Sequence, residues 1–166
     1  MNHEELMIDV SNVCFYDIND QKVSLSIFKG AILILSGGGS QAAMEEAKKW
    51  RKSLEEYAAR ENVKYIEVAF VGKLPPFFPK QFIKNNILKD VKKEGYSTPP
   101  LIDWDGKAME ILGVVKSNLC NIFVIDKHGF LRYKLVEKYS QEALNKIKDY
   151  IKKLASQNEN INPEKV

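Results

Sequence analysis

A glycine-rich segment is the part of this sequence whose residue types and spacing best suit ligand chemistry. Ser36-Gly37-Gly38-Gly39-Ser40 follows the apolar run Ala31-Ile32-Leu33-Ile34-Leu35, and Ser40 is a suitable N-cap for the helical pattern after it. A strand, glycines and a helix N-terminus together present backbone N–H groups and a partial positive charge, which can hold a phosphate, sulfate or carboxylate. The predicted anion or small-ligand loop comprises Gly37, Gly38, Gly39, Ser40 and Gln41.

The same glycines have a simpler interpretation, in which they only allow the chain to turn. The segment has neither the Lys-Ser/Thr of a P-loop nor a G-x-G-x-x-G pattern, so it contains no nucleotide-binding motif. Both interpretations stay open at the level of sequence.

The remaining polar candidates are cysteines, histidines and aspartates. Two cysteines, Cys14 and Cys120, cannot form a CxxC pair, a four-ligand zinc site or a scaffold of several disulfides. The histidines, His3 and His128, are too few and too scattered to predict a metal site, and no cofactor is predicted.

Two aspartates, Asp103 and Asp105, flank Trp104. Alternation in an extended segment would place both carboxylates on one face, where they could act as an acid–base pair. Turn formation before Gly106 explains the same two residues without catalysis.

Two adjacent phenylalanines lie in a proline-rich segment, Leu74-Pro75-Pro76-Phe77-Phe78-Pro79. Its prolines remove backbone donors and restrict their neighbours, so the segment is predicted to be a loop. Exposed Phe77 and Phe78 would form a partner-docking surface, because exposed aromatic side chains often mark protein contacts. In the alternative, both rings fold back onto the core.

Length and composition fit one globular domain. The 166 residues are 45% apolar and 28% charged, which disfavours disorder and fibrous repeats. The net charge of +3 is spread over segments in which both signs alternate, so no nucleic-acid partner is predicted.

No apolar run approaches the roughly 18–20 residues of a membrane helix, and no membrane partner is predicted. Residues 1–5 lack the cationic start of a secretory signal, so we expect a cytoplasmic protein unless a leader has been removed.

Apolar periodicity predicts a mixed order of strands and helices. A strand at 31–35, a helix from 41 to about 60 and a strand at 63–71 form a βαβ unit with parallel strands. The other predicted elements are a hairpin of residues 13–18 and 22–25, a helix between Pro79 and Gly95, a short strand at 101–103, a small helix at 108–112, a hairpin of residues 121–126 and 130–136, and a final helix from Ser140. One domain is predicted over residues 8–155, with a disordered polar tail at 156–166.

The order of these segments resembles the thioredoxin-like superfamily, in particular the redoxin branch that includes peroxiredoxins and thiol oxidoreductases of the TlpA and ResA type. Residues 17–30, Asp-Ile-Asn-Asp-Gln-Lys-Val-Ser-Leu-Ser-Ile-Phe-Lys-Gly, are similar to the redoxin motif D-x-x-G-K-x-V-x-L-S-D-F-K-G. Residues 113–114, Gly-Val, and 123–129, Phe-Val-Ile-Asp-Lys-His-Gly, are similar to the later motif G-V … P-T-x-F-[LV]-I-D-x-x-G. The resemblance implies a thioredoxin-like three-layer α/β sandwich, in which helices flank a central mixed β-sheet and a β-hairpin lies at the N-terminus.

Two departures from the family pattern bear on function. The redoxin active-site cysteines stand at the start of the helix after the central strand, where residues 36–45 of this chain contain no cysteine. Peroxidatic and dithiol chemistry both need a thiolate, and serine cannot replace it. The family's cis-proline aligns with Cys120, where a non-proline residue favours a trans bond. The chain is similar to the cysteine-less thioredoxin-like proteins of the YtfJ type, whose corresponding loop is also a stretch of Gly and Ser before a helix.

The resemblance makes Cys120 the remaining candidate catalytic residue, because its aligned position faces the loop at residues 38–42. It would react as a single thiol or bind a soft ligand, or else it is a small buried apolar side chain. We predict a redox-inactive thioredoxin-like domain that is a binding or regulatory module for an unknown protein or a small ligand such as an anion. The alternative is a peroxiredoxin-like thiol oxidoreductase that acts through Cys120 alone.

Overall fold

The second half of the apolar run, from residue 33, lies in the central strand of the sheet, as its continuous hydrophobicity predicts, whereas residues 31 and 32 precede the strand. The computed structural model describes residues 3–72 and 74–159. In this structure β4 (Leu33–Gly38) is buried along its whole length. Parallel β5 (Lys64–Phe70) pairs with one edge of β4, and antiparallel β7 (Asn121–Ile125) pairs with the other.

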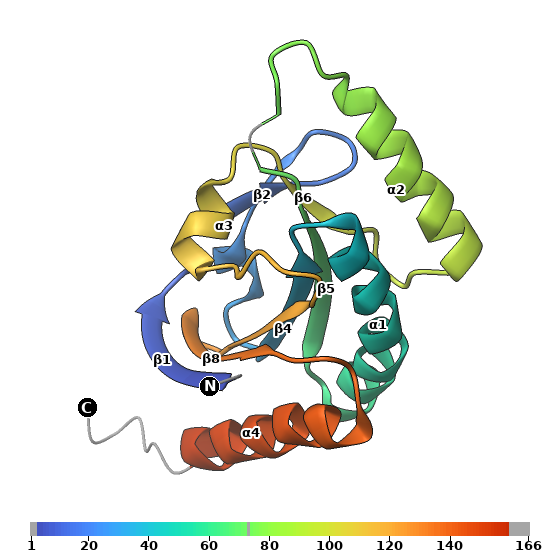
Figure 1. Cartoon of the computed structure of the whole chain (residues 1–166). Helices are drawn as coiled ribbons and strands as arrows, with labels where there is room; N and C mark the ends of the chain where they lie inside the picture. Colours follow the sequence, from blue (N-terminus) through green and yellow to red (C-terminus); the bar gives the residue numbers. More distant parts are fainter. Residues whose placement is uncertain (1–2, 73, 160–166) are drawn as a thin grey trace.

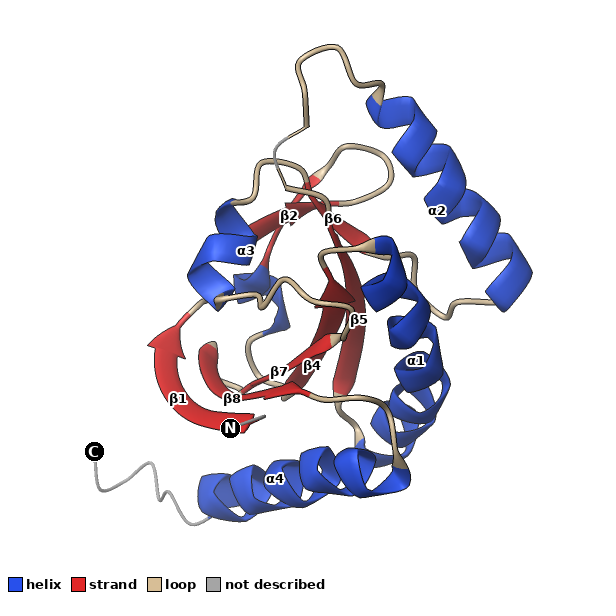
Figure 2. Ribbon diagram, viewed as in Figure 1, coloured by secondary structure: helices blue, strands red, loops and turns tan. Residues whose placement is uncertain are grey.

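Eight strands form one mixed sheet in the order β1-β8-β7-β4-β5-β6-β2-β3 (Figure 2). Strands β4, β5 and β6 (Leu101–Asp103) run parallel, and the other neighbouring pairs are antiparallel. The pair β2 (Cys14–Tyr16) and β3 (Lys22–Ser24) and the pair β7 and β8 (Phe130–Val136) confirm the two predicted hairpins.

Helices and irregular segments cover both faces of the sheet, which confirms the predicted three-layer arrangement (Figure 1). The helices are α1 (Gln41–Glu61), α2 (Lys80–Glu94), α3 (Lys107–Leu112) and α4 (Gln141–Glu159), with a short 3-10 helix η1 at Leu25–Phe28. Trp50 of α1 and Ile147 of α4 are fully buried on one face, and Val10 and Leu112 are buried on the other. Burial of each such side chain stabilises the fold by roughly 1.5–3 kcal/mol before conformational entropy is subtracted.

The α2 helix forms where the apolar spacing predicts it, and Gly95 ends it in a left-handed conformation with φ of 65°. In contrast to the other helices, α2 has no buried residue. Figure 1 shows it at the periphery of the molecule, beyond α1. Its predicted apolar face therefore packs only partly on the rest of the domain. None of the described helices combines the length and apolar composition needed to cross a membrane.

The two ends of the domain differ from the prediction. Strand β1 (His3–Asp9) was not predicted, because it is an edge strand with a largely polar sequence. With β1 included, the domain begins before residue 8, which is the predicted boundary. At the other end α4 continues to Glu159, past the predicted boundary at 155, so residues 156–159 are helical rather than disordered. The rest of the predicted tail, 160–166, lies outside the described residues.

A buried ion pair joins α1 to β5. The Arg51 guanidinium donates to the Glu67 carboxylate from Nε at 2.9 Å and from Nη2 at 3.2 Å. Their side chains are only 6% and 1% exposed, respectively. The Tyr96 ring stacks on the guanidinium, with Arg51 Cζ 3.4 Å from the ring centroid. Because separating the pair would leave a buried charge without its partner, this contact fixes the position of α1 on the sheet.

Candidate functional site

The carboxyl ends of β4, β5 and β6 meet at one edge of the sheet, and α1 begins at this edge. Ser40 is the N-cap of α1, as the sequence predicts, and its Oγ accepts a hydrogen bond from Ala43 N at 3.1 Å. The same hydroxyl donates to Ser117 O at 3.0 Å, in the segment that precedes β7. The Ser40 hydroxyl therefore ties the start of α1 to that segment, at the place where the redoxin pattern has a thiol.

The structure corrects the predicted ligand loop at its first two residues, because Gly37 and Gly38 are the last residues of β4. Both pair with residues of β5. A Cβ atom on Gly37 would lie 2.3 Å from Val68 O, and one on Gly38 would lie 2.3 Å from Ala43 Cβ. At these two positions β5 or α1 approaches β4 too closely for a side chain, which accounts for glycine there without a turn.

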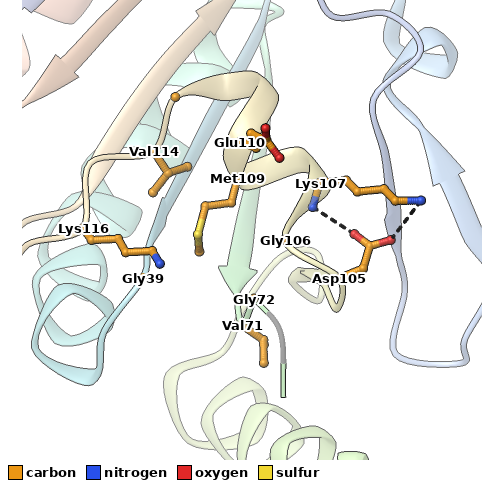
Figure 3. A pocket seen from close by; sticks show the side chains of 11 residues that line it. Gly39, Val71, Gly72, Asp105, Gly106, Lys107, Met109, Glu110, Val114 and Lys116 are labelled. Atoms are coloured by element: carbon orange, nitrogen blue, oxygen red, sulfur yellow. Dashed lines mark hydrogen bonds and ion pairs between the residues drawn. The ribbon is translucent and has the colours of Figure 1, made fainter. Parts of the chain in front are cut away.

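Gly39 faces open space. A Cβ atom there would lie 3.6 Å from Met109 Cε and 3.8 Å from Lys116 Cγ, which are ordinary contacts. Beside it lies a pocket of about 850 Å³, bounded by α3 and by the segments that follow β5, β6 and α3 (Figure 3). Four of its eleven lining residues are glycines, so little side-chain volume fills this space.

Charges of both signs line this pocket. Lys107 and Lys116 supply cations, and Asp105 and Glu110 supply carboxylates. Asp105 Oδ1 accepts a hydrogen bond from Lys107 N at 3.0 Å, and Oδ2 lies 3.9 Å from Lys107 Nζ (Figure 3). Lys116 forms no ion pair with a described residue, and it extends beside Gly39. Lys116 and Glu110 are therefore the two charged side chains of this pocket without an ion-pair partner among the described residues.

The two aspartates lie close enough to interact, but Asp103 is buried and Asp105 is exposed. Asp103 is 1% exposed, and its Oδ2 accepts a hydrogen bond from Met109 N at 3.0 Å. Its Oδ1 is buried and has no hydrogen-bond partner among the described residues. Burial raises the pKa of the Asp103 carboxyl, the charge of Asp105 raises it further, and the Met109 N–H opposes both. Asp105 forms the turn before α3, so each carboxylate has a structural role at the start of that helix.

Cys120 lies at the end of β4, next to Gly37, but on the buried side of the sheet. Its side chain is inaccessible, and its thiol donates to Asn121 O at 3.6 Å. Burial raises the pKa of this thiol, and the negative charge of Glu67 raises it further. Cys120 does not line the pocket beside Gly39. The described peptide bonds are all trans, including the one before Cys120, as expected.

Cys14 cannot pair with Cys120. Both thiols are free, and Cys14 lies on β2, four strand intervals from β7 in the sheet order. At about 4.8 Å per interval the two strands are ~19 Å apart. A disulfide needs Cα atoms within about 7 Å.

The predicted aromatic loop is exposed and does not fold back onto the core. Phe77 is 87% exposed and Phe78 is 38% exposed. The Phe78 ring packs edge to face against Phe82 of α2, with centroids 6.4 Å apart.

Between α2 and the start of α1 lies a second hollow, the α1–α2 cleft, of about 400 Å³. Ser40 and Gln41 line this cleft, and Gly39 borders both it and the larger pocket.

Sequence reasoning missed the residues that face Gly39 across the pocket, Met109 and Lys116. They are about seventy residues away in the chain, and no motif links them to the glycines. His128 is exposed in the turn between β7 and β8. Within residues 3–72 and 74–159, no group of three or more His, Cys, Asp or Glu side chains is placed to hold a metal ion.

No protein-family model matches this chain, and no curated protein matches its sequence. Solved structures do match its fold. A DsbF homologue from Corynebacterium diphtheriae has a TM-score of 0.66 at 18% identity, over 90% of this chain and 93% of that chain. A secreted thiol-disulfide isomerase from Corynebacterium glutamicum has a TM-score of 0.64 at 13% identity, over 87% of each chain. An exposed lipoprotein thioredoxin from Streptococcus pneumoniae has a TM-score of 0.56 at 21% identity, over 81% of this chain and 95% of that chain.

These similarities show that the fold is thioredoxin-like, as the sequence motifs predict. The three neighbours are named for thiol–disulfide chemistry, whereas this chain has no CxxC pair. The similarity to YtfJ-type proteins stays a prediction.

The close contacts at β4 predict a strong contrast between two glycines. Gly37→Ala should lower the free energy of unfolding by about 1–3 kcal/mol, because Val68 O and the Phe70 ring must move. Gly39→Ala should change it by less than about 0.5 kcal/mol, because the new methyl group meets only ordinary contacts. Urea denaturation of both variants measures the difference. Equal stability of the two variants would contradict the close packing at Gly37.

Proposed function

We propose that this thioredoxin-like domain is a binding or regulatory module for a protein or a small ligand and does not carry out thiol redox chemistry. The observation that carries the proposal is the state of Cys120, which is wholly buried and whose pKa is raised by burial. Thiol–disulfide exchange and peroxide reduction both begin with attack by an accessible thiolate. The start of α1 instead holds Ser40 and Gln41.

The alternative, a thiol oxidoreductase that acts through Cys120 alone, meets two obstacles. A substrate would have to reach a sulfur atom packed among residues such as Trp50 and Ile122. The thiolate would also have to form near the negative charge of Glu67, which raises the Cys120 pKa. Both obstacles favour the binding function.

The pocket beside Gly39 supports the binding of a small anion. Gly39, Ser40 and Gln41 stand at the start of a 21-residue helix whose first turn contains no acidic residue. Lys116 extends beside Gly39 without an ion-pair partner among the described residues. A phosphate or carboxylate group in this pocket would meet Lys116 and the backbone at Gly39, just before the helix N-terminus. Of the predicted anion loop, Gly39 borders this pocket, whereas Ser40 and Gln41 line the α1–α2 cleft.

If the protein does not carry out thiol redox chemistry, it should show no thiol-dependent turnover of a disulfide or a peroxide. Insulin reduction and peroxide consumption by the protein should equal the rates of the Cys120→Ser variant, because the Cys120 thiol is inaccessible. Both rates should also equal the background of the assay without protein. Turnover in the wild type that disappears in Cys120→Ser would overturn the proposed function.

The binding half predicts thermal stabilisation by phosphate, sulfate or acetate, because a ligand that binds only the folded state stabilises it. Lys116→Ala should abolish this shift in melting temperature. Gly39→Leu should reduce the shift, because leucine fills the space beside Met109. Lys64→Ala, at an exposed position on β5, is the matched control and should leave the shift unchanged. An anion-induced shift that is identical in the wild type and Lys116→Ala would contradict this site.

A further inference from the structure

The outer surface of α2 and of the loop before it carries aromatic and cationic side chains that the fold leaves uncovered. Figure 1 shows this helix at the periphery of the molecule. At its start Phe77 is 87% exposed and Phe82 is 58% exposed. The ring of Phe78 packs against Phe82, and Phe77 precedes Phe78 in the loop. Exposed aromatic side chains of this kind mark an interaction site.

Three lysines continue this surface along the helix. Phe82, Lys89 and Lys93 are spaced by seven and four residues, which places them on one face of α2, and Lys92 is adjacent. All three lysines are exposed, and none forms an ion pair with a described residue. By contrast, Lys84 on the inner side of α2 is paired with Asp20. The outer face of α2 therefore carries positive charge that the domain itself does not neutralise.

The α1–α2 cleft adjoins this face. Ile83 and Ile87 line it from α2, and Met44 and Phe70 line it from the body of the domain. Asn86, four residues after Phe82, also lines the cleft, so the cleft and the outer face are continuous around the helix. Asp90 lines it as well, 3.8 Å from Lys48 Nζ. The α1–α2 cleft, which has apolar side chains among its lining residues, therefore lies beside the three lysines of α2.

We propose that the outer face of α2 and the α1–α2 cleft together dock an acidic segment of a partner protein. An apolar side chain of the segment enters the cleft, and its carboxylates lie against Lys89, Lys92 and Lys93. The concave cleft favours a polypeptide over a lipid surface, which cannot place a side chain between α1 and α2. A nucleic-acid backbone has no aliphatic side chain that could fill a cleft lined by Met44, Ile83 and Ile87. This inference deepens the proposed binding function and rests on it.

The test uses the whole protein and a labelled helical peptide, with leucine at spacings of three and four and glutamate at the other positions. Fluorescence anisotropy should show binding of this peptide and none of a matched peptide with lysine in place of glutamate. Reversal of the three lysines together (Lys89→Glu, Lys92→Glu, Lys93→Glu) should weaken binding at least about tenfold, and high salt should weaken wild-type binding.

Two variants keep the test specific. Reversal of Lys64, Lys138 and Lys152 to glutamate makes the same change in net charge at exposed positions outside α2, and should leave the affinity within about twofold. Ile87→Asp places a charge in the cleft without disturbing a buried residue, and should weaken binding of the acidic peptide as strongly as the α2 reversals.

Three outcomes would overturn the proposal: no binding of the acidic peptide, equal loss in both triple variants, or binding only to phosphatidylserine vesicles or a single-stranded oligonucleotide. A redox-inactive protein that fails to bind the acidic peptide would refute this docking surface alone. Thiol-dependent insulin reduction would refute the proposed function, whatever the peptide does. The two failures are therefore distinguishable.

Discussion

The close approach of α1 and β5 to the end of β4 is the constraint on which the rest of the site depends. Val68 O and Ala43 Cβ occupy the space that side chains at Gly37 and Gly38 would need. This packing sets the start of α1 against the end of the central strand, and the Arg51–Glu67 ion pair holds the middle of the helix on β5. The N-terminus of α1, Gly39 and the pocket beside it take their positions from these contacts.

The same packing separates the thioredoxin-like architecture from its usual chemistry. The helix N-terminus, which favours an anion or a thiolate, is present, but the hydroxyl of Ser40 occupies it and is bound to Ser117. The nearest thiol, Cys120, faces the core beneath β4, where burial opposes its ionisation. The groups that remain accessible at this edge of the sheet are backbone atoms and charged side chains of both signs around an open pocket. Such a surface suits binding.

Local patterns were sufficient to predict most of the fold. The apolar run before Gly37, the periodicity from Ala43 to Tyr57 and the two hairpins all follow from residue spacing, and the redoxin motifs gave the layer order. The site was harder, because a run of glycines looks the same in a loop and in a tightly packed strand. That Gly37 is packed and Gly39 is open depends on Phe70 and Met109, which are distant in sequence. The uncovered face of α2 was also beyond prediction, because its spacing matches that of a helix with a buried face.

The central claim, that the site has lost an available thiol, is tested most directly by the alkylation rate of Cys120. The Cys14→Ser variant leaves Cys120 as the single thiol, and mass spectrometry follows its reaction with iodoacetamide at pH 8 in the native and the urea-unfolded protein. The account predicts native alkylation slower by about a hundredfold or more, limited by opening of the fold. A native rate equal to the unfolded rate would contradict it.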